Sequence, residues 1–371
     1  MMRAAQADGE HWGLAAKACV AALAPLAEDA NLGFVYVTEA FADDLSSIVT
    51  FLRETTPVTT WLGGVGLGVF GPAGAIGEGR SMAVLAGHVA ADSVLPFDRF
   101  DPAEQTEFIA LHGDWLARQS AVTGLVHGDP REPQIAEMVS GLAAAGHAFL
   151  IGGLTAASEI PVQVSGRVHG AGLSGALFGD GLRLVTGLSQ GCTPIGVTHR
   201  ATEVIDNVLM ALDGRPALEV LKSEAGDIIA RDLQRAAGYI HIALPIEGSD
   251  GHDYAVRGLL AIDPRRGWLA VGEHLVAGDR LMFVRRDPNA AQKDLERMLG
   301  GLAKRLAGQT IRGGVYISCI GRGAQMFGRE GRELDMIYEA LGRFPLVGFA
   351  ANGEICNDRL YSFTGVLALF L

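Results

Sequence analysis

The sequence predicts a mixed α/β protein built from repeated strand–helix–strand–turn–strand units, with sheets covered by helices. Apolar residues alternate over short runs, which is typical of strands, and recur every three or four residues in longer stretches, which is typical of amphipathic helices. A glycine-rich phrase, Gly348–Ile355 (GFAANGEI), also has a near copy without gaps at Gly153–Ile160 (GLTAASEI). Together, these observations favour duplicated units within one chain over a solenoid, because the period is long and interrupted.

The same order of elements recurs three times. In the first repeat, residues 32–89, Asp43 and Asp44 begin a helix with apolar residues at i, i+3, i+4 and i+7, and Pro57 ends it. A second repeat covers 122–179, and a third occupies the C-terminal part of the chain. Helices are expected over 10–27, in the second half of 90–120, and between the first two strands of each repeat. The expected strands are 32–37, 58–62, 81–87, 122–127, 148–151, 176–178, 314–319, 345–347 and 365–370.

A fainter repeat lies between these units and sets the predicted domains. Residues 181–214 align without gaps on 267–300, and each segment reads as a pair of strands followed by a helix. We therefore expect two related lobes, 20–214 and 238–371, joined by a helical connector over 215–237. The sequence DGRP at 213–216 is a strong break followed by a helix start. The two helices of this fainter repeat would carry Val204, Ile205, Val208, Leu209 and Leu212 in one copy, and Leu295, Met298, Leu299 and Leu302 in the other.

Composition excludes several functional classes. Of the 371 residues, 49% are apolar and 19% are charged, which is typical of a globular, well-buried protein. The net charge of −12 argues against a nucleic-acid partner, since phosphates require a basic surface. No apolar run approaches the roughly 20 residues of a membrane span, and the N-terminus lacks a signal-peptide pattern. Because four cysteines do not make a disulfide framework in a chain of this length, we expect a cytoplasmic protein without a membrane partner.

Common cofactor motifs are absent or misplaced. Residues 66–71 and 170–175 match G-x-G-x-x-G, but neither stretch opens a helix, which dinucleotide binding requires. No phosphate-binding loop is present, and the ten histidines lack zinc-site spacing. A lone histidine in an apolar setting is more often a hydrogen-bonded core residue, although one could serve as an axial ligand to haem iron. No cofactor is therefore expected, and haem is the alternative left open.

Three acceptor side chains follow the glycine-rich phrases. Glu354, with Asn352 beside it, and Glu159 in the near copy could accept hydrogen bonds from an ammonium or amide group. The alternative is that the glycines serve a turn and the glutamates are solvated. A catalytic carboxylate pair also remains conceivable, but it needs a separation that the sequence does not give.

Two further phrases bring polar groups to strand ends. Cys319 ends a strand and is followed by the glycine-flanked Arg322, which could in principle activate the thiol. No Cys-His-Asn order accompanies them, so an enzyme with Cys319 as nucleophile is the alternative from another class, and burial as a core residue is the plain one. Gln190 and Cys192 lie in a polar break between two strands, where a turn role is equally plausible.

Four phrases together resemble the FIST family of bacterial sensory proteins, which have N-terminal and C-terminal FIST regions. They are residues 189–196 (SQGCTPIG), 212–219 (LDGRPALE), 318–323 (SCIGRG) and 348–355, in matching order and spacing. The resemblance implies a cytoplasmic input protein that binds small ligands such as amino acids or their derivatives. It also implies coupling to a separate signalling output protein, such as a histidine kinase. Some relatives look like haem-binding sensors of diatomic gases.

The first repeat departs from the family pattern. The family usually has GCSTAGEI there, but this chain has GGVGLGVF at 63–70, with Val69 standing where Glu354 stands. Because valine removes a charge and an acceptor, no ligand role is expected in the first repeat. The expectation is a non-enzymatic sensory protein in which Arg322 holds a ligand carboxylate. Glu354, Asn352 and Glu159 would then accept hydrogen bonds, and Cys319, Gln190 and Cys192 would line the site.

Overall fold

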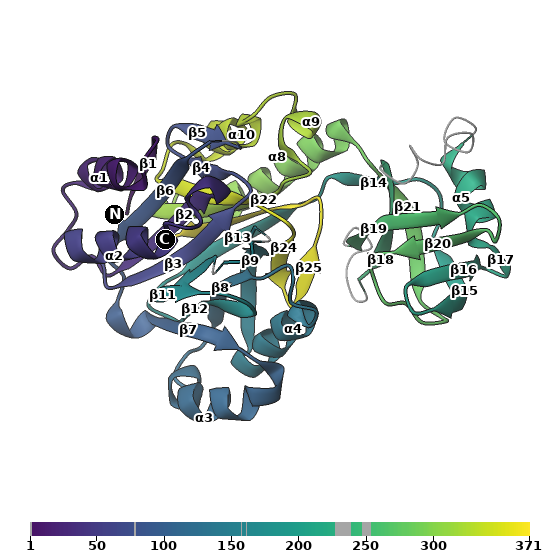
Figure 1. The fold of residues 1–371 in the computed structure, drawn as a ribbon, viewed down its shortest axis with the longest axis horizontal. Coiled ribbons are helices and arrows are strands. Elements are labelled where there is room, and N and C mark those ends of the chain that lie inside the picture. Colours follow the sequence, from purple (N-terminus) through teal and green to yellow (C-terminus); the bar gives the residue numbers. More distant parts are fainter. Residues whose placement is uncertain (1, 78, 157, 161, 227–238, 247–253) are drawn as a thin grey trace. The chain divides into compact units, whose positions relative to one another are not determined.

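The computed structural model describes residues 2–77, 79–156, 158–160, 162–226, 239–246 and 254–371. The fold is mixed α/β, as predicted, and the chain forms two compact units (Figure 1). The first, called here the three-sheet unit, comprises Met1–Gln190, Gln292–Leu360 and Thr364–Leu371. The second, called the barrel unit, comprises Gly191–Ala291 and Tyr361–Phe363. No helix in the described ranges combines the length and the apolar character needed to span a membrane.

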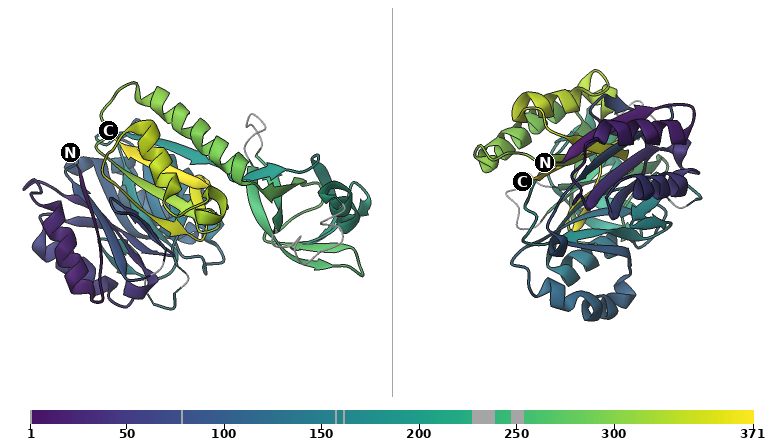
Figure 2. Two further views of the ribbon diagram at one scale, coloured as in Figure 1. Left: turned by 90° about the horizontal axis from the view of Figure 1, so that it is seen from above. Right: turned by 90° about the vertical axis from the view of Figure 1, so that its left-hand side faces the viewer.

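The first sheet of the three-sheet unit is built mostly from the first repeat. Its strand order is β1-β6-β2-β3-β10-β11, and β2 and β3 are its parallel pair. Helix α2 (Leu45–Thr55) connects these two strands and packs with α1 (Trp12–Leu23) against one face of the sheet (Figure 2). The strands are β1 (Arg3–Asp8), β2 (Leu32–Thr38), β3 (Thr60–Gly66), β6 (Ser81–Gly87), β10 (Gln163–Ser165) and β11 (Arg167–His169).

The second sheet repeats this order as β7-β12-β8-β9-β24-β25, with β8 and β9 as its parallel pair. Helix α4 (Ile135–Gly146) connects that pair, and α3 (Gln105–Leu116) packs beside α4. Helix α4 begins two residues after Pro133. The strands are β7 (Val94–Phe100), β8 (Val122–Gly128), β9 (Ala148–Leu154), β12 (Leu173–Phe178), β24 (Glu354–Asn357) and β25 (Arg359–Tyr361).

The third sheet has the order β13-β26-β22-β23-β4-β5, with β22 and β23 parallel. Two helices, α9 (Gly323–Phe327) and α10 (Arg332–Leu341), connect this pair, and α8 (Pro288–Leu306) precedes β22. Short 3₁₀ helices cover Glu39–Phe41, Ala91–Ser93 and Pro102–Glu104. The strands are β4 (Val69–Gly71), β5 (Gly74–Ile76), β13 (Leu184–Ser189), β22 (Gly313–Cys319), β23 (Leu346–Ala351) and β26 (Gly365–Phe370).

Each repeat donates a hairpin to the sheet of another repeat. Strands β4 and β5 of the first repeat join the third sheet, β10 and β11 of the second join the first sheet, and β24 and β25 of the third join the second sheet. Because backbone hydrogen bonds therefore cross between all three repeats, the repeats form one compact unit. The predicted lobes, 20–214 and 238–371, do not coincide with the units of the structure.

The barrel unit is inserted into the third repeat, between β13 and α8. Strands β15, β16, β20, β19, β18 and β21 pair antiparallel in that order, and β21 pairs back to β15, which closes the barrel. Helix α5 (Ala217–Ala225) packs on its core. The remaining part of the predicted connector, 227–237, lies outside the described residues. The strands are β14 (Cys192–Pro194), β15 (His199–Ile205), β16 (Val208–Leu212), β17 (Arg215–Pro216), β18 (Ile240–Pro245), β19 (Tyr254–Asp263), β20 (Trp268–Val271) and β21 (Arg280–Arg286).

The helix predicted through Val204–Leu212 is wrong. These residues form the β15–β16 hairpin, and Asp206 has a positive φ of 52° at its turn. A short apolar run carries no periodicity that separates a strand from a helix, so the local pattern was ambiguous. The matching prediction for 295–302 is confirmed, because that segment lies in α8.

Candidate ligand-binding site

Three glycines align the repeats at the parallel strand pairs. Gly63, Gly152 and Gly348 each lie opposite a residue of the neighbouring parallel strand. A β-carbon added at these glycines would come within 1.8, 2.0 and 1.7 Å, respectively, of a carbonyl oxygen on that neighbouring strand. Glycine is therefore required for the close approach of the two strands, and not for a turn. The predicted glycine turn at 348–356 is mostly strand, with β23 and β24 joined through Asn352 and Gly353.

The donated hairpins show which residue corresponds to Glu354. Glu354 begins β24 and lies opposite Gly153, the residue that follows the aligned glycine. In the first sheet the corresponding position is Gln163, and in the third sheet it is Val69. The match of Val69 to Glu354 is thus confirmed by the strand register. The match of Glu159 is wrong, because a longer loop in the second repeat places Gln163 at this position.

The Glu354 carboxyl group is completely buried. The backbone N–H and the hydroxyl of Thr364 donate hydrogen bonds to Oε2 at 3.1 and 2.7 Å. Burial raises the pKa of Glu354 to about 8, although the Thr364 hydrogen bonds, the charge of Arg322 and the Cys319 thiol act in the opposite direction. Glu354 is therefore a protonated acid in the folded protein at neutral pH.

This shift makes the free energy of unfolding depend on pH. Between about pH 4.5 and 8 the folded protein keeps the Glu354 proton that the unfolded chain releases, so stability from this group falls as pH rises. Glu354→Gln retains an oxygen acceptor for Thr364 but cannot ionise. The variant should gain stability relative to the wild type by about 1.4 kcal/mol per pH unit across this window.

Urea unfolding at pH 5, 6.5 and 8 measures that difference. The exposed Glu137→Gln on α4 provides a control that removes a carboxylate from the surface. A constant difference between Glu354→Gln and the wild type from pH 5 to 8 would contradict the assignment of a buried neutral acid.

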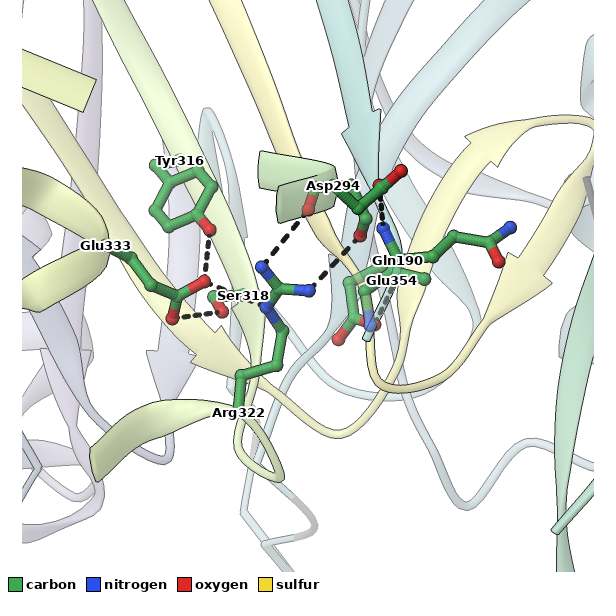
Figure 3. Close-up of polar contacts among 9 residues, drawn as sticks. Gln190, Asp294, Tyr316, Ser318, Arg322, Glu333 and Glu354 are labelled. Carbon is green, nitrogen blue, oxygen red and sulfur yellow. Dashed lines mark hydrogen bonds and ion pairs between the residues drawn. The ribbon is translucent and has the colours of Figure 1, made fainter. Parts of the chain in front are cut away.

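Arg322 lies at the centre of a buried polar network (Figure 3). Its Nε donates to Oε1 of Glu333 at 2.8 Å, and its two terminal nitrogens donate to the backbone oxygen and hydroxyl of Ser189, both at 3.3 Å. The Tyr316 and Ser318 hydroxyl groups also donate to Glu333, at 2.6 and 3.0 Å. Burial disfavours the charged guanidinium, but the neighbouring Glu333 outweighs it, and the pKa of Arg322 is raised.

A cavity of about 80 Å³ lies beside this network. It is at the carboxyl end of β22 and is closed by α9, the loop before α10 and the β4–β5 hairpin, which is where parallel strand pairs commonly bind ligands. Because one water molecule needs roughly 10–15 Å³ on this measure of volume, the cavity has room for about six non-hydrogen atoms. Its lining includes Gly68, Phe70, Ala75, Ile76, Gly77, Tyr316, Ser318, Cys319, Phe327, Arg329, Glu330, Arg332, Glu333 and Ala350.

The structure brings only some of the predicted site residues to this place. Cys319 lines the cavity, Arg322 is bonded to the lining residue Glu333 (Figure 3), and Glu354 has the Cys319 thiol as a neighbour. Asn352 does not line the cavity, and its side-chain amide donates to the Thr155 carbonyl at 2.9 Å. Arg322 is predicted to hold a ligand carboxylate, but its guanidinium already binds Glu333 and Ser189.

The other three predicted residues lie elsewhere. Glu159 is exposed in the loop before β10. The backbone N–H of Gln190 donates to Oδ2 of Asp294 at 2.7 Å, which ties the end of β13 to α8. Cys192 belongs to the barrel unit, where its carbonyl accepts a hydrogen bond from the Tyr254 hydroxyl at 2.6 Å.

Sequence reasoning missed most of the cavity wall. Tyr316, Ser318 and Glu333 were read as ordinary strand and helix residues, and Phe70 belongs to a hairpin that was not predicted. One signal was present: Glu333 lies in a helix that begins shortly after the Ser318–Gly323 phrase, and its carboxylate pairs with Arg322.

Among the described histidines, His127 is the most deeply buried. His127 is fully buried, its Nε2 lies 3.1 Å from the Tyr36 hydroxyl, and burial lowers its pKa to about 3. Its ring packs near Tyr36 and Phe349 in the centre of the three-sheet unit. Across the described ranges, no group of three or more His, Cys, Asp or Glu residues comes together to hold a metal ion. The haem alternative stays a prediction.

The fold and cavity define a class: a three-sheet α/β protein with an inserted barrel and a small ligand-sized cavity at a parallel strand end. The chain belongs to the FIST family. The model of the FIST N domain matches residues 31–215, and that of the FIST C domain matches residues 217–357. FIST domains are associated with sensing and signal transduction. The border between the two regions falls inside the barrel unit and close to the predicted lobe boundary.

Curated relatives carry no functional description. A protein of Mycobacterium tuberculosis (strain ATCC 25618 / H37Rv), Uncharacterized protein Rv0628c, is 36% identical over 205 residues, which is 52% of each chain. Uncharacterized protein Mb0898c of Mycobacterium bovis is 35% identical over 205 residues, or 52% of this chain and 51% of the relative. The chain thus spans about half the length of the curated relatives it matches.

Proposed function

We propose that the protein is a ligand-binding sensory protein in which an amino acid or related small metabolite occupies the cavity beside β22. The observation that carries the proposal is the cavity itself, whose wall combines hydroxyl, thiol and charged groups of both signs with aromatic rings. Pockets of this kind, with a few convergent polar groups, are the usual places for small ligands.

The size of the cavity favours a short ligand. Room for about six non-hydrogen atoms fits alanine or serine and excludes large side chains, unless the surrounding loops move. The wall contains charged groups of both signs, with Arg329 and Arg332 beside Glu330 and Glu333.

The test uses a residue that lines the cavity without supporting the fold. Gly77 lines the cavity, and a β-carbon added there meets no atom within 4 Å, so Gly77→Leu adds a side chain to the cavity lining without a clash of its β-carbon. Gly300→Leu on α8 is the matched control, since it too meets nothing within 4 Å and does not line the cavity. A thermal-shift screen of the twenty amino acids is run on all three proteins.

The wild type and Gly300→Leu should be stabilised by at least one small amino acid, by about 2.7 kcal/mol at 100 times its Kd. Gly77→Leu should lose this stabilisation while it unfolds in the same temperature range as the wild type. The proposal fails if Gly77→Leu keeps the full ligand response, or if no amino acid stabilises the wild type.

Two parts of the proposal concern the wider role. We propose that the bound state is read by a separate signalling output protein, such as a histidine kinase, as the family membership suggests. We also propose that the site binds its ligand without catalysis. Support comes from Cys319, which has the neutral acid Glu354 as a neighbour and lies beside a network whose charges are already paired.

A further inference from the structure

We infer that the cavity recognises its ligand through an ammonium group, held by the Glu330 carboxylate and by the aromatic rings of Phe70, Tyr316 and Phe327. This inference rests on the proposed function and specifies which end of the ligand the protein holds. It replaces the prediction that Arg322 holds a ligand carboxylate.

The charges around the cavity leave a carboxylate in excess. Each of its nearby arginines pairs with an acid: Arg322 with Glu333 at 2.8 Å, Arg332 with Glu339 at 2.7 Å, and Arg329 with Asp335. Glu330 also lines the cavity, and within the described ranges it forms no ion pair.

The contacts of Glu330 leave its carboxylate available to a ligand. Oε1 accepts one long hydrogen bond, from the Ala324 backbone N–H at 3.4 Å. The carboxylate lies close to the start of α9, since a β-carbon added at Gly323 would lie 3.6 Å from Oε1, in van der Waals contact. The residue is exposed and also lines the cavity, so its carboxylate can be reached by a cation from solvent.

Aromatic rings provide the second element of cation recognition. Phe70 and Tyr316 lie with ring centroids 5.8 Å apart, and both line the cavity with Phe327. Phe327 already binds one cation through its ring, since the Arg322 guanidinium carbon lies 4.9 Å from the ring centroid. Ring faces attract ammonium groups, and the attraction increases as water is excluded. A small acid without an ammonium group would find no unpaired cation in this wall.

The hydroxyl groups that line the cavity do not favour an anionic ligand. The Tyr316 and Ser318 hydroxyl groups both donate to Glu333, so their protons are directed away from a ligand carboxylate. A ligand hydroxyl or ammonium group can instead donate to these oxygens.

Three probes that share a branched carbon centre separate the two ends of the ligand. Alanine carries both charges, isopropylammonium replaces its carboxylate with a methyl group, and isobutyrate replaces its ammonium with a methyl group. Isothermal titration calorimetry measures the Kd of each for the wild-type protein. Alanine and isopropylammonium should bind, and isobutyrate should bind at least tenfold more weakly than isopropylammonium.

Substitutions test which residues bind the ammonium group. Glu330→Gln should weaken isopropylammonium binding by about threefold to fivefold, as expected for a partly exposed ion pair. Phe70→Leu should weaken it by about fivefold, and Phe70→Tyr, which keeps the ring, should restore it. Glu137→Gln, the exposed control on α4, should leave the Kd unchanged.

Two results overturn the inference: isobutyrate binding as tightly as isopropylammonium, or Glu330→Gln binding isopropylammonium as tightly as the wild type. If either occurs while Gly77→Leu still abolishes alanine binding, the ammonium assignment fails and the site stands. If Gly77→Leu binds alanine as the wild type does, the proposed function fails as well.

Discussion

Gly348→Ala is expected to lower the free energy of unfolding by at least about 3 kcal/mol, or to prevent folding. The added β-carbon would lie 1.7 Å from the Tyr316 carbonyl oxygen, a backbone atom of the parallel strand β22. To relieve this overlap, β22 and β23 would have to separate. Their separation would break the backbone hydrogen bonds between the two strands, which also support the cavity wall. Urea unfolding followed by circular dichroism measures the change.

The control for this prediction is Gly77→Ala, in which the new β-carbon meets no atom within 4 Å. It should change the free energy of unfolding by less than about 0.5 kcal/mol. If Gly348→Ala proves as stable as Gly77→Ala, the close approach of the two strands is not what requires glycine.

Arg322→Ala is expected to lower the free energy of unfolding by about 3–5 kcal/mol, because it leaves the buried Glu333 without its charge partner. The change also removes the hydrogen bonds to Ser189 and the contact with the Phe327 ring. Chemical unfolding of the wild type and the variant at pH 7 measures the loss.

A matched ion pair at the surface separates burial from charge. Arg332 pairs with Glu339 at 2.7 Å, and both side chains are partly or largely exposed, so Arg332→Ala should cost less than about 1 kcal/mol. If the two substitutions lower the free energy of unfolding equally, the buried Arg322 contributes no more to stability than an arginine in a surface ion pair. The network would then not be what holds the cavity wall.

Much of the three-sheet unit could be predicted because its strands and helices are encoded by patterns in the local sequence. The alternating runs at 32–37, 81–87 and 314–319 are strands, and the stripe of Leu45, Ile48 and Leu52 is a helix. Every position of these strands is buried and the helix buries one face, so the apolar residues that predict them are present in the local sequence. Strand register, in contrast, depends on partners far away in sequence.

The exchanged hairpins could not be predicted for that reason. Strands β4, β10 and β24 are short, and each pairs with a strand of another repeat. An alignment without gaps therefore matched Glu354 to Glu159, although the backbone pairing matches it to Gln163. The inserted barrel was missed because its ends, near Gln190 and Gln292, carry no break as strong as that at 213–216.

The candidate site was predicted in part. The Ser318–Gly323 phrase correctly indicated a polar strand end, and Cys319 lines the cavity there. The role of Arg322 was not predictable, since its partner Glu333 approaches only when α10 packs beside β22. Whether a charged side chain faces a ligand or a buried partner is decided by packing, which the local sequence does not record.

Hydrogen–deuterium exchange with and without saturating alanine tests the central claim most directly, because it reports the place of binding. The account predicts slower exchange in two segments, 68–77 and 320–334, which carry most of the cavity wall, and unchanged exchange in the barrel strands β15, β16 and β20. Binding of alanine with protection confined to the barrel, or to the outer helices α1 and α3, would contradict it.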